Sequence, residues 1–559
     1  MHGARWQVAD GAVPEDLGRA YPGLMARVMA NRGITTATEA ELFLAGDARL
    51  VGDPMLLPDI QPAMTRIYRA ILGHEAVVVY GDYDTDGITA TAIMVTGLKR
   101  LGANASPYIP HRLSEGYGLK TDALKKMAAE GVSLVVSVDC GVNAVAEVKT
   151  AAKMGIDVII TDHHLPGHEL PPAVAVINPK RPDSEYPFTE LSGAGVAFKV
   201  VEALFHGMGK PLPQEHFLEL TALGTIADIM PLTGENRYLV KEGLKHLNDH
   251  PSPGLTEIIN LSRLRTGQLD AESISWQVAP RLNAAGRLNH AIAGYNLLTA
   301  TSAGEAAELA AELEAQNIER QRLTLLYVNK ARDRVLAEPL KSLLFIEDEE
   351  CPQGILGLVA GRLSDEFYRP SIVVRRDGEL ATASCRSIPG FNITAAIDRC
   401  GHLLAHYGGH AQAAGFSLKP KDLPELAMML GEIAERELAS LDLQPVLHID
   451  AEAMLKELGG GLFQMLQRLA PFGQGNRPPL FVSRCVTAAG YRTIGASGDH
   501  LKMRLTQGGV VWEAIAFRQA ARMLEILPDP LDIVYNLEMD RFNGRETLRL
   551  NIVDFAPSV

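Results

Sequence analysis

Residues 76–89 read AVVVYGDYDTDGIT. The first five are apolar and mostly β-branched, a composition typical of a buried strand. Three aspartates then follow at alternate positions, Asp82, Asp84 and Asp86. Like charges so close together repel one another, so the chain must neutralise them with cations or expose them in a turn. The stretch therefore predicts a buried strand that ends in a cluster of carboxylates, within an α/β fold.

A second stretch farther along repeats this arrangement. The apolar run 158–160 is followed, after Thr161, by Asp162, His163 and His164. Carboxylates and imidazoles placed just past buried strands indicate a divalent-metal site at the edge of an α/β sheet. The two stretches together therefore favour an enzyme of phosphoryl transfer.

The chain from residue 75 to about 231 alternates apolar runs with helical stretches. Such alternation favours a parallel, doubly wound sheet. Strands are expected at 76–80, 105–109, 133–138, 157–161 and 174–177. Asp82, Asp139 and Asp162 each fall just past one of these strands, so they should meet at the carboxyl edge of the sheet.

The rest of the chain contains three further regions. Residues 305–338 contain neither Gly nor Pro and follow a possible capping box at Ser302 and Glu305, which predicts a helix about 50 Å long that bridges domains. A second α/β unit follows, with strands expected at 342–346 and 371–374. Beyond residue 445, short strands separated by Gly turns predict a small β-barrel of the oligonucleotide-binding type. These strands are expected at 479–483, 501–505, 510–516, 532–537 and 547–553.

A chain of 559 residues is too long for a single core. We therefore expect a multidomain α/β protein. Its expected parts are a helical N-terminal lead-in at 1–70, a catalytic domain at 71–250, a connecting region with the long helix at 251–339, a second α/β domain at 340–444 and a barrel at 445–559.

Composition narrows the class of protein only a little. Hydrophobic residues make up 47% and charged residues 21% of the chain, which is ordinary for a globular protein. The net charge of −14 argues weakly against a nucleic-acid-binding protein, because a local cleft can be positive on an acidic body. The five cysteines are scattered, which fits a reducing compartment and argues against a zinc cluster. With neither a membrane-length apolar stretch nor a secretory signal, a cytoplasmic location is expected.

The acidic residues form a plausible set of metal ligands. Carboxylates with one or two imidazoles suit Mn²⁺ or Mg²⁺. Two such ions about 3.5–4 Å apart can activate a water and hold a phosphate for in-line attack. A helix cap is the simpler interpretation of any single aspartate, but it does not account for the whole set. The candidate ligands are Asp82, Asp84, Asp86, Asp139, His163 and Asp228.

The tripeptide at residues 162–164 resembles the signature of the DHH phosphoesterase family. The segments 79–89 and 137–141 resemble the RecJ branch of that family, and the likeness extends from about residue 50 to the end. The resemblance implies a DHH domain, a long connecting helix, a DHH-associated domain and an oligonucleotide-binding barrel. It also implies a metal-dependent 5′→3′ exonuclease that degrades single-stranded DNA to mononucleotides in DNA repair and recombination. The resemblance further implies that the protein is a monomer and works beside a single-strand-binding protein and a RecQ-type helicase.

The resemblance also implies roles for individual residues. Smaller members of the family have a metal-binding His where this chain has Tyr80, and Asp82 is the expected replacement. One ion is then expected on Asp82, Asp84 and Asp139, and the other on Asp86, Asp139, His163 and Asp228. His164 is expected to contact the substrate phosphate and to form the catalytic set with Asp84 and Asp139, while Asp162 orients the histidines.

Several segments resemble the family's substrate contacts. The expected contact residues are Arg281, Asn283, Arg287, Ser384, Arg386, Asn392, Gly408, Gly409 and His410. Arg281 and Arg287 would hold backbone phosphates. Ser384, Arg386 and Asn392 would bind the 5′-terminal phosphate, and the glycines would let backbone N–H groups approach a phosphate. Cys351 and Pro352 stand where relatives commonly show Trp-His, which leaves the role of that loop open.

Two other interpretations remain. A small-substrate DHH phosphodiesterase, acting on oligoribonucleotides or cyclic dinucleotides, would resemble only residues 75–440. The barrel and the aspartate-first motif argue against it. An inactive DHH scaffold would have lost metal ligands, whereas the expected set is complete here.

Overall fold

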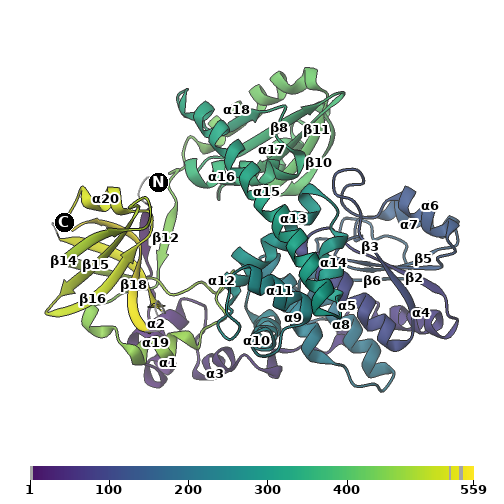
Figure 1. Ribbon diagram of the computed structural model, residues 1–559, viewed down its shortest axis with the longest axis horizontal. Helices are drawn as coiled ribbons and strands as arrows, with labels where there is room; N and C mark the ends of the chain where they lie inside the picture. The colour runs from purple at the N-terminus through teal and green to yellow at the C-terminus, as the bar shows by residue number, and fades with distance from the viewer. Residues whose placement is uncertain (1–3, 528–529, 541–545, 559) are drawn as a thin grey trace. The chain divides into compact units, whose positions relative to one another are not determined.

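A computed structural model describes residues 4–527, 530–540 and 546–558 (Figure 1). The chain divides into two compact units. One runs from Val51 to Leu443, and the other joins the N-terminal residues up to Leu50 with those from Gln444 onward. The segment 1–70, which the sequence presents as one lead-in, is therefore divided between the two units.

The larger unit contains a five-stranded, fully parallel sheet. Its strands, in spatial order, are β3 (Asn104–Tyr108), β2 (Ala76–Tyr80), β4 (Leu134–Val138), β5 (Asp157–Thr161) and β6 (Ala175–Ile177). The predicted strands are confirmed to within one residue at each end. After β2, the next strand β3 pairs with one edge of β2, and β4 pairs with its other edge. The order of the strands therefore reverses between β2 and β4. Such a reversal opens a crevice at the carboxyl ends of the two strands.

Helices cover both faces of this sheet (Figure 1). Val77 and Val79 of β2 face a core that includes α4 (Ile60–Leu72), α5 (Thr85–Leu101) and α8 (Gly193–Gly207). Val78 and Tyr80 face the opposite core, built on α6 (Thr121–Ala129) and α7 (Val145–Lys153). Because both faces are buried, the strands read as continuous apolar runs rather than alternating patterns.

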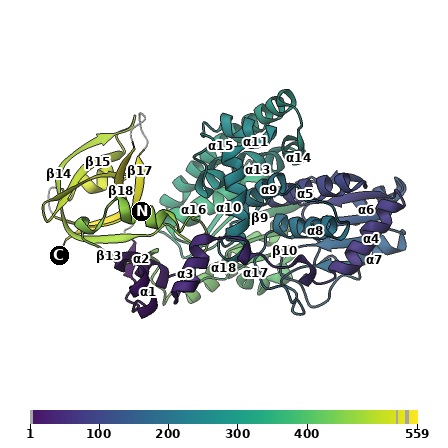
Figure 2. The same cartoon turned by 90° about the horizontal axis from the view of Figure 1, so that it is seen from below.

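A helical layer follows the sheet. It comprises α9 (Gln214–Ala227), α10 (Gly234–Asp249), α11 (Pro253–Leu261), α12 (Ala271–Ser273), the π-helical turn η3 (Ile274–Val278), α13 (Ala279–Leu288), α14 (Ile292–Thr299) and α15 (Ala303–Leu336). The 34-residue α15 begins at Ser302, whose hydroxyl accepts a hydrogen bond from the Glu305 amide. Figure 2 shows α15 beside α11, α13 and α14.

The long helix α15 joins two hydrophobic cores. Ala306, Ala310 and Leu313 pack in the core of the parallel sheet. Val328 and Val335, near the other end, pack in a separate core with α16 (Leu356–Phe367). The predicted bridging helix is thus confirmed, and at 1.5 Å per residue it is about 50 Å long.

The second sheet of this unit has five strands in the order β10 (Leu404–His410), β11 (Ala413–Leu418), β9 (Leu380–Arg386), β8 (Ser371–Asp377) and β7 (Leu344–Glu347). Only β7 and β8 are parallel. Helices α17 (Ile393–Asp398) and α18 (Leu423–Leu438) pack against it. The sequence pattern predicted β7 and β8 but missed the other three strands.

The smaller unit contains the barrel. Its strands are β14 (Phe481–Ile494), β15 (His500–Gln507), β16 (Val510–Ala516), β18 (Thr547–Pro557) and β17 (Leu531–Asp540), and pairing of β17 with β14 closes the circle. The short β13 (Ala451–Glu452) adds to β14. The predicted five-stranded barrel is therefore confirmed.

The N-terminal residues belong to the same unit. The strand β1 (Arg5–Val8) pairs with β12 (Val446–Ile449). Helices α1 (Glu15–Ala20), α2 (Gly23–Ala30) and α3 (Ala37–Ala45) share a core with the barrel and with α19 (Gly460–Gln467). The lead-in was expected to be helical throughout, but it begins with a strand, because β12 supplies hydrogen-bond partners that are far away in the sequence.

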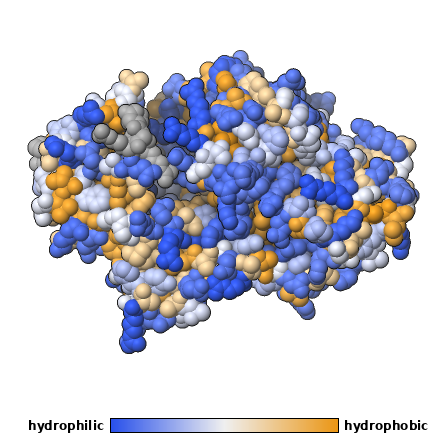
Figure 3. All heavy atoms as spheres, turned by 60° about the horizontal axis from the view of Figure 1, so that its bottom comes forward, coloured by the Kyte–Doolittle hydropathy of each residue, from blue (hydrophilic) through white to orange (hydrophobic). Residues whose placement is uncertain are grey.

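The surface mixes polar and apolar residues. Figure 3 shows one face, on which hydrophobic residues lie in small groups between hydrophilic ones, as is usual for globular proteins. Among the helices of the described residues, none combines the length and the apolar character needed to cross a membrane.

Candidate metal centre

The carboxylates gather where the strand order of the parallel sheet reverses. Asp82, Asp84 and Asp86 follow β2, and Asp139 follows β4, its neighbour in the sheet. Asp84 is also the N-cap of α5, and its Oδ1 accepts a hydrogen bond from the Gly87 amide over 3.1 Å. Asp228 joins them from the C-terminal end of α9. The predicted meeting of Asp82 and Asp139 at one sheet edge is what the structure shows.

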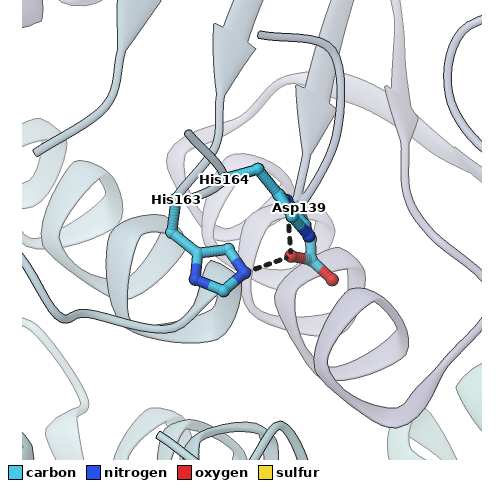
Figure 4. Close-up of side chains that lie close together, drawn as sticks. All are labelled: Asp139, His163 and His164. Carbon is cyan, nitrogen blue, oxygen red and sulfur yellow. Dashed lines mark ion pairs between the residues drawn. The ribbon is translucent and has the colours of Figure 1, made fainter. Parts of the chain in front are cut away.

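His163 is close to three of the carboxylates, and Figure 4 shows it beside Asp139, which also faces His164. The Nε2 atom of His163 is 3.0 Å from Asp139 Oδ1, 3.5 Å from Asp228 Oδ2 and 3.8 Å from Asp86 Oδ2. Candidate ligand atoms within 4.8 Å of one another form overlapping groups, which are Asp82 with Asp84 and Asp139, Asp86 with His163 and Asp228, and Asp139 with His163 and His164. The first group is the set expected from the sequence for one ion. The second group contains the residues expected for the other ion, except that it lacks Asp139.

The cluster concentrates negative charge away from water. Burial, followed by repulsion from neighbouring aspartates, raises the pKa of Asp86 to about 7 and the pKa of Asp228 to about 8. The same causes put the pKa values of Asp82 and Asp139 well above the usual range for aspartate. Burial, with the nearby His164, lowers the pKa of His163 to about 3. The pocket therefore favours a neutral imidazole, which is the form that binds a metal ion.

Unpaired atoms show that a cation fits this pocket. Asp82 Oδ1, Asp139 Oδ1 and His163 Nε2 are buried and lack a hydrogen-bond partner. Asp139 Oδ1 and His163 Nε2 lie 3.0 Å apart without a hydrogen bond, and a cation between them would satisfy both buried atoms. Adjacent ligands of one octahedral ion at about 2.1 Å are themselves about 3 Å apart. The donors, oxygen with one nitrogen, suit Mn²⁺ or Mg²⁺.

Asp162 holds the two histidines in place. Its Oδ1 accepts hydrogen bonds from the His163 and His164 amides and lies 2.8 Å from His164 Nδ1, and its Oδ2 accepts from the Val142 amide. Although burial opposes charge on both side chains, their mutual hydrogen bond lowers the pKa of Asp162 and raises the pKa of His164 to about 9. His164 therefore presents a cationic ring beside the carboxylates.

Backbone packing leaves little freedom to the aspartates. Asp86 accepts hydrogen bonds from the amides of Gly193 and Ala194, at the N-terminus of α8, where the helix dipole favours negative charge. A Cβ atom at Gly193 would lie 2.5 Å from the Asp139 side chain. The close approach of α8 to the cluster therefore requires glycine at this position.

A cavity of about 870 Å³ opens beside the cluster, between the carboxyl edge of the parallel sheet and the second sheet. From the first side it is lined by Tyr83, Arg112, Tyr117, Asp162 and His164, and from the second by Ser384, Arg386, Gly408, Gly409 and His410. On the second sheet, Gly408 and Ser384 both pair with Gly415 of the strand between them. Five of the nine predicted substrate contacts are thus brought together with His164.

The four remaining predicted contacts do not line this cavity. Arg281 forms a two-point ion pair with Glu314 of α15. Asn392 caps α17, and Asn283 accepts a hydrogen bond from the Thr85 amide, at the start of α5. Arg287 donates to the Gly354 carbonyl oxygen, in the loop that departs from relatives at Cys351 and Pro352. Their contacts with a substrate stay predictions.

Arg112 is a candidate that sequence reasoning missed. It follows β3 and stacks over the Tyr83 ring, with the guanidinium carbon 4.7 Å from the ring centre. Burial, followed by repulsion from Arg112, Arg320 and Arg386, lowers the pKa of Arg287 to about 9. Guanidinium groups held so close together favour an anion among them. The rule that found the aspartates, polar residues just past a parallel strand, would also have found Arg112.

Family models match three segments of the chain. They are the DHH family N-terminal domain at residues 76–225, the DHHA1 domain at 334–436 and the RecJ OB domain at 449–554. The single-stranded-DNA-specific exonuclease RecJ of Bacillus subtilis is 38% identical over 539 residues, covering 96% of this chain and 68% of the relative. The chain belongs to the RecJ family. RecJ of Dickeya dadantii is 32% identical, covering 99% and 98% of the two chains.

Solved structures of the RecJ family share this fold. The crystal structure of Thermus thermophilus RecJ in complex with Mn²⁺ has a TM-score of 0.86 and 30% identity, covering 99% of this chain and 80% of the other. The Mg²⁺ complex of the same protein has a TM-score of 0.79 and 28% identity, covering 99% of this chain and 79% of the other.

Proposed function

We infer that this chain is a metal-dependent exonuclease that degrades single-stranded DNA. The observation that carries the inference is the convergence of six candidate ligands, from segments after three parallel strands and after α9, beside an arginine-lined cavity. The relatives are named single-stranded-DNA-specific exonucleases, and the RecJ crystal structures contain Mn²⁺ or Mg²⁺.

Two divalent cations, Mn²⁺ or Mg²⁺, would occupy the cluster. Asp82, Asp84 and Asp139 hold one, and Asp86, Asp139, His163 and Asp228 hold the other, with Asp139 shared. Bound there, the ions activate water and hold the scissile phosphate. The chain's own contribution is to fix the ligands on rigid strand ends and to keep His163 neutral.

His164 acts on the substrate. Its cationic ring lines the cavity and is held by Asp162, so it contacts a nonbridging oxygen of the scissile phosphate and stabilises the charge that develops there. With Asp84 and Asp139 it forms the catalytic set. Removal of the ring therefore slows the chemical step more than it weakens binding.

The arginine side of the cavity binds the 5′-terminal phosphate. The residues that line this space include Arg112, Ser384, Arg386, Gly408, Gly409 and His410, and the guanidinium group of Arg287 is repelled by those of Arg112 and Arg386. A terminal phosphate bound here places the next phosphodiester over the metal cluster. The consequence is 5′→3′ cleavage that releases mononucleotides.

The barrel supplies further contacts with the strand. Barrels of this type bind single strands through basic grooves and aromatic platforms without sequence preference. With the catalytic unit, this supports a role in DNA repair and recombination, beside a single-strand-binding protein and a RecQ-type helicase. We propose that the chain works as a monomer in the cytoplasm.

Digestion of labelled DNA tests the function. With Mn²⁺, 5′-labelled single strands should release labelled mononucleotide at the earliest times, whereas blunt duplex and a dinucleotide should be poorer substrates. Asp139→Ala should abolish cleavage, and Asp122→Ala, at an exposed aspartate of α6, should leave it unchanged. Intact single strands, or faster cleavage of the dinucleotide than of the long strand, would reject the proposal in favour of an inactive scaffold or a small-substrate phosphodiesterase.

A further inference from the structure

Trp276 stands out among the three tryptophans of the chain. Trp6 and Trp512 are partly buried and donate hydrogen bonds through their indole N–H groups. The Trp276 side chain is instead 69% exposed, on the π-helical turn η3. Single exposed apolar side chains are common and prove nothing by themselves. Single π-helical turns, however, occur frequently at functional sites.

The helix that carries Trp276 lies against the metal cluster. The Ala279 carbonyl oxygen accepts a hydrogen bond from the Thr85 hydroxyl, and the Asn283 side chain accepts one from the Thr85 amide. A Cβ atom at Gly286 would lie 2.7 Å from the Tyr83 carbonyl oxygen. The helix from η3 to the end of α13 therefore packs directly on the turn that holds Asp84.

Three side chains mark one stripe of this helix. Trp276, Asn283 and Arg287 are spaced i, i+7 and i+11, which puts them on roughly the same face. Arg287 lies at the cationic end, near Arg112 and Arg386. Asn283 lies at the metal turn, and Trp276 lies about 10 Å farther along the axis, on the side away from Arg287.

We propose that Trp276 is a stacking platform for a nucleobase on the 3′ side of the scissile phosphate. The proposal rests on the proposed function, in which the 5′-terminal phosphate lies at the arginine end and the scissile phosphate at the metals. The uncleaved strand then leaves along the helix past Trp276. Stacking on an indole ring accepts any base, which agrees with an exonuclease that must process every sequence.

Binding provides the first test. A phosphorothioate single strand that resists hydrolysis should quench the exposed indole, and the quenching should disappear in Trp276→Phe, which leaves only Trp6 and Trp512 to emit. Quenching of equal size in both proteins would overturn the proposal.

Kinetics on abasic substrates provides the second test. Trp276→Ala should raise KM for an intact single strand by about 5-fold to 100-fold with little change in kcat, whereas Trp276→Phe should keep most of the affinity. An abasic site at one of the second to fourth nucleotides should raise KM of the wild-type protein. The same abasic site should not raise KM further in Trp276→Ala, because the two changes remove the same contact. Leu72→Ala, at an 81% exposed side chain at the end of α4 before β2, should match the wild-type protein.

The outcomes separate the two proposals. Failure of the wild-type protein to cleave the intact strand would count against the exonuclease. Suppose instead that the wild-type protein cleaves normally. An unchanged KM in Trp276→Ala, or effects of the substitution and the abasic site that add at every position, would then count against the platform alone.

Discussion

Asp139 has an unusual backbone conformation. Its φ of +59° lies in the left-handed region, which costs free energy in residues other than glycine and is maintained when surrounding structure requires it. The conformation turns the chain sharply after β4 and places Oδ1 beside His163 and within 4.0 Å of His164. In the proposed function both ions share this one side chain, so a residue that fixes its position should also control metal binding.

Gly193 is such a residue. Gly193→Ala should weaken Mn²⁺ binding by about 10-fold to 100-fold, because the new methyl group would displace the Asp139 carboxylate. Titration calorimetry with Mn²⁺ measures the change. Gly195→Ala, in the same helix with 3.4 Å to its nearest neighbour, is the matched control and should bind like the wild-type protein. Equal affinities in the two variants would contradict the expectation.

At the scale of helices and strands, an arginine that forms an ion pair with a neighbouring element has fewer donors left to bind a DNA phosphate. Arg281 of α13 donates two hydrogen bonds to Glu314 of α15, from Nε and Nη2 on one edge of its guanidinium group, and both side chains are largely buried. Arg386 of β9 faces the cavity instead. The two arginines, both expected from the sequence to contact phosphates, therefore occupy different environments.

We expect the two to respond differently to truncation. Arg281→Ala should lower the free energy of unfolding by about 1–3 kcal/mol, because it removes charged hydrogen bonds between two helices, and should change KM little. Arg386→Ala should raise KM for single strands about tenfold while leaving stability nearly unchanged, since one charged contact of about 1.4 kcal/mol is lost. Urea unfolding and steady-state kinetics on the same preparations check this. A large KM effect for Arg281→Ala would restore its predicted phosphate contact.

The strands of the parallel sheet could be predicted because their signal is local. Residues 134–138 are buried on both faces, so the sequence shows a run that is apolar except for Ser137 and is followed by Asp139. The strand β10 carries mostly exposed residues and exists because β11 pairs with it, which no local pattern reveals. The same holds for Asn283, whose partner Thr85 is 198 residues away. Ligands at strand ends follow from the fold class, whereas partners across helices follow only from packing.

At the scale of the whole molecule, the two units have separate cores. The core of the smaller unit joins Leu17, Met25 and Met29 of the N-terminal helices to Phe481 and Phe555 of the barrel. The candidate metal ligands all belong to the larger unit, Val51–Leu443. Binding of a cation should therefore stabilise one unit and leave the other unaffected.

Calorimetry measures this directly. At a Mn²⁺ concentration 100 times the dissociation constant, the larger unit should gain about 2.7 kcal/mol, so its unfolding transition moves to a higher temperature while that of the barrel unit stays in place. Excess chelator should reverse the shift, and Asp139→Ala should not show it. An equal shift of both transitions would mean that the metal does not bind at the carboxylate cluster.

The strand order also determines when the metal centre can assemble during synthesis of the chain. The strand that pairs with β2 on the side of Asp139 is β4, which is synthesised after β3. The carboxylates after β2 therefore approach Asp139 only once β4 has been made. The last candidate ligand, Asp228, comes after α8 and α9. Contacts so far apart in sequence form late in folding. A nascent chain therefore has no assembled nuclease centre until the helix that ends at Ala227 has left the ribosome, and the emerging protein cannot cut nearby DNA before then.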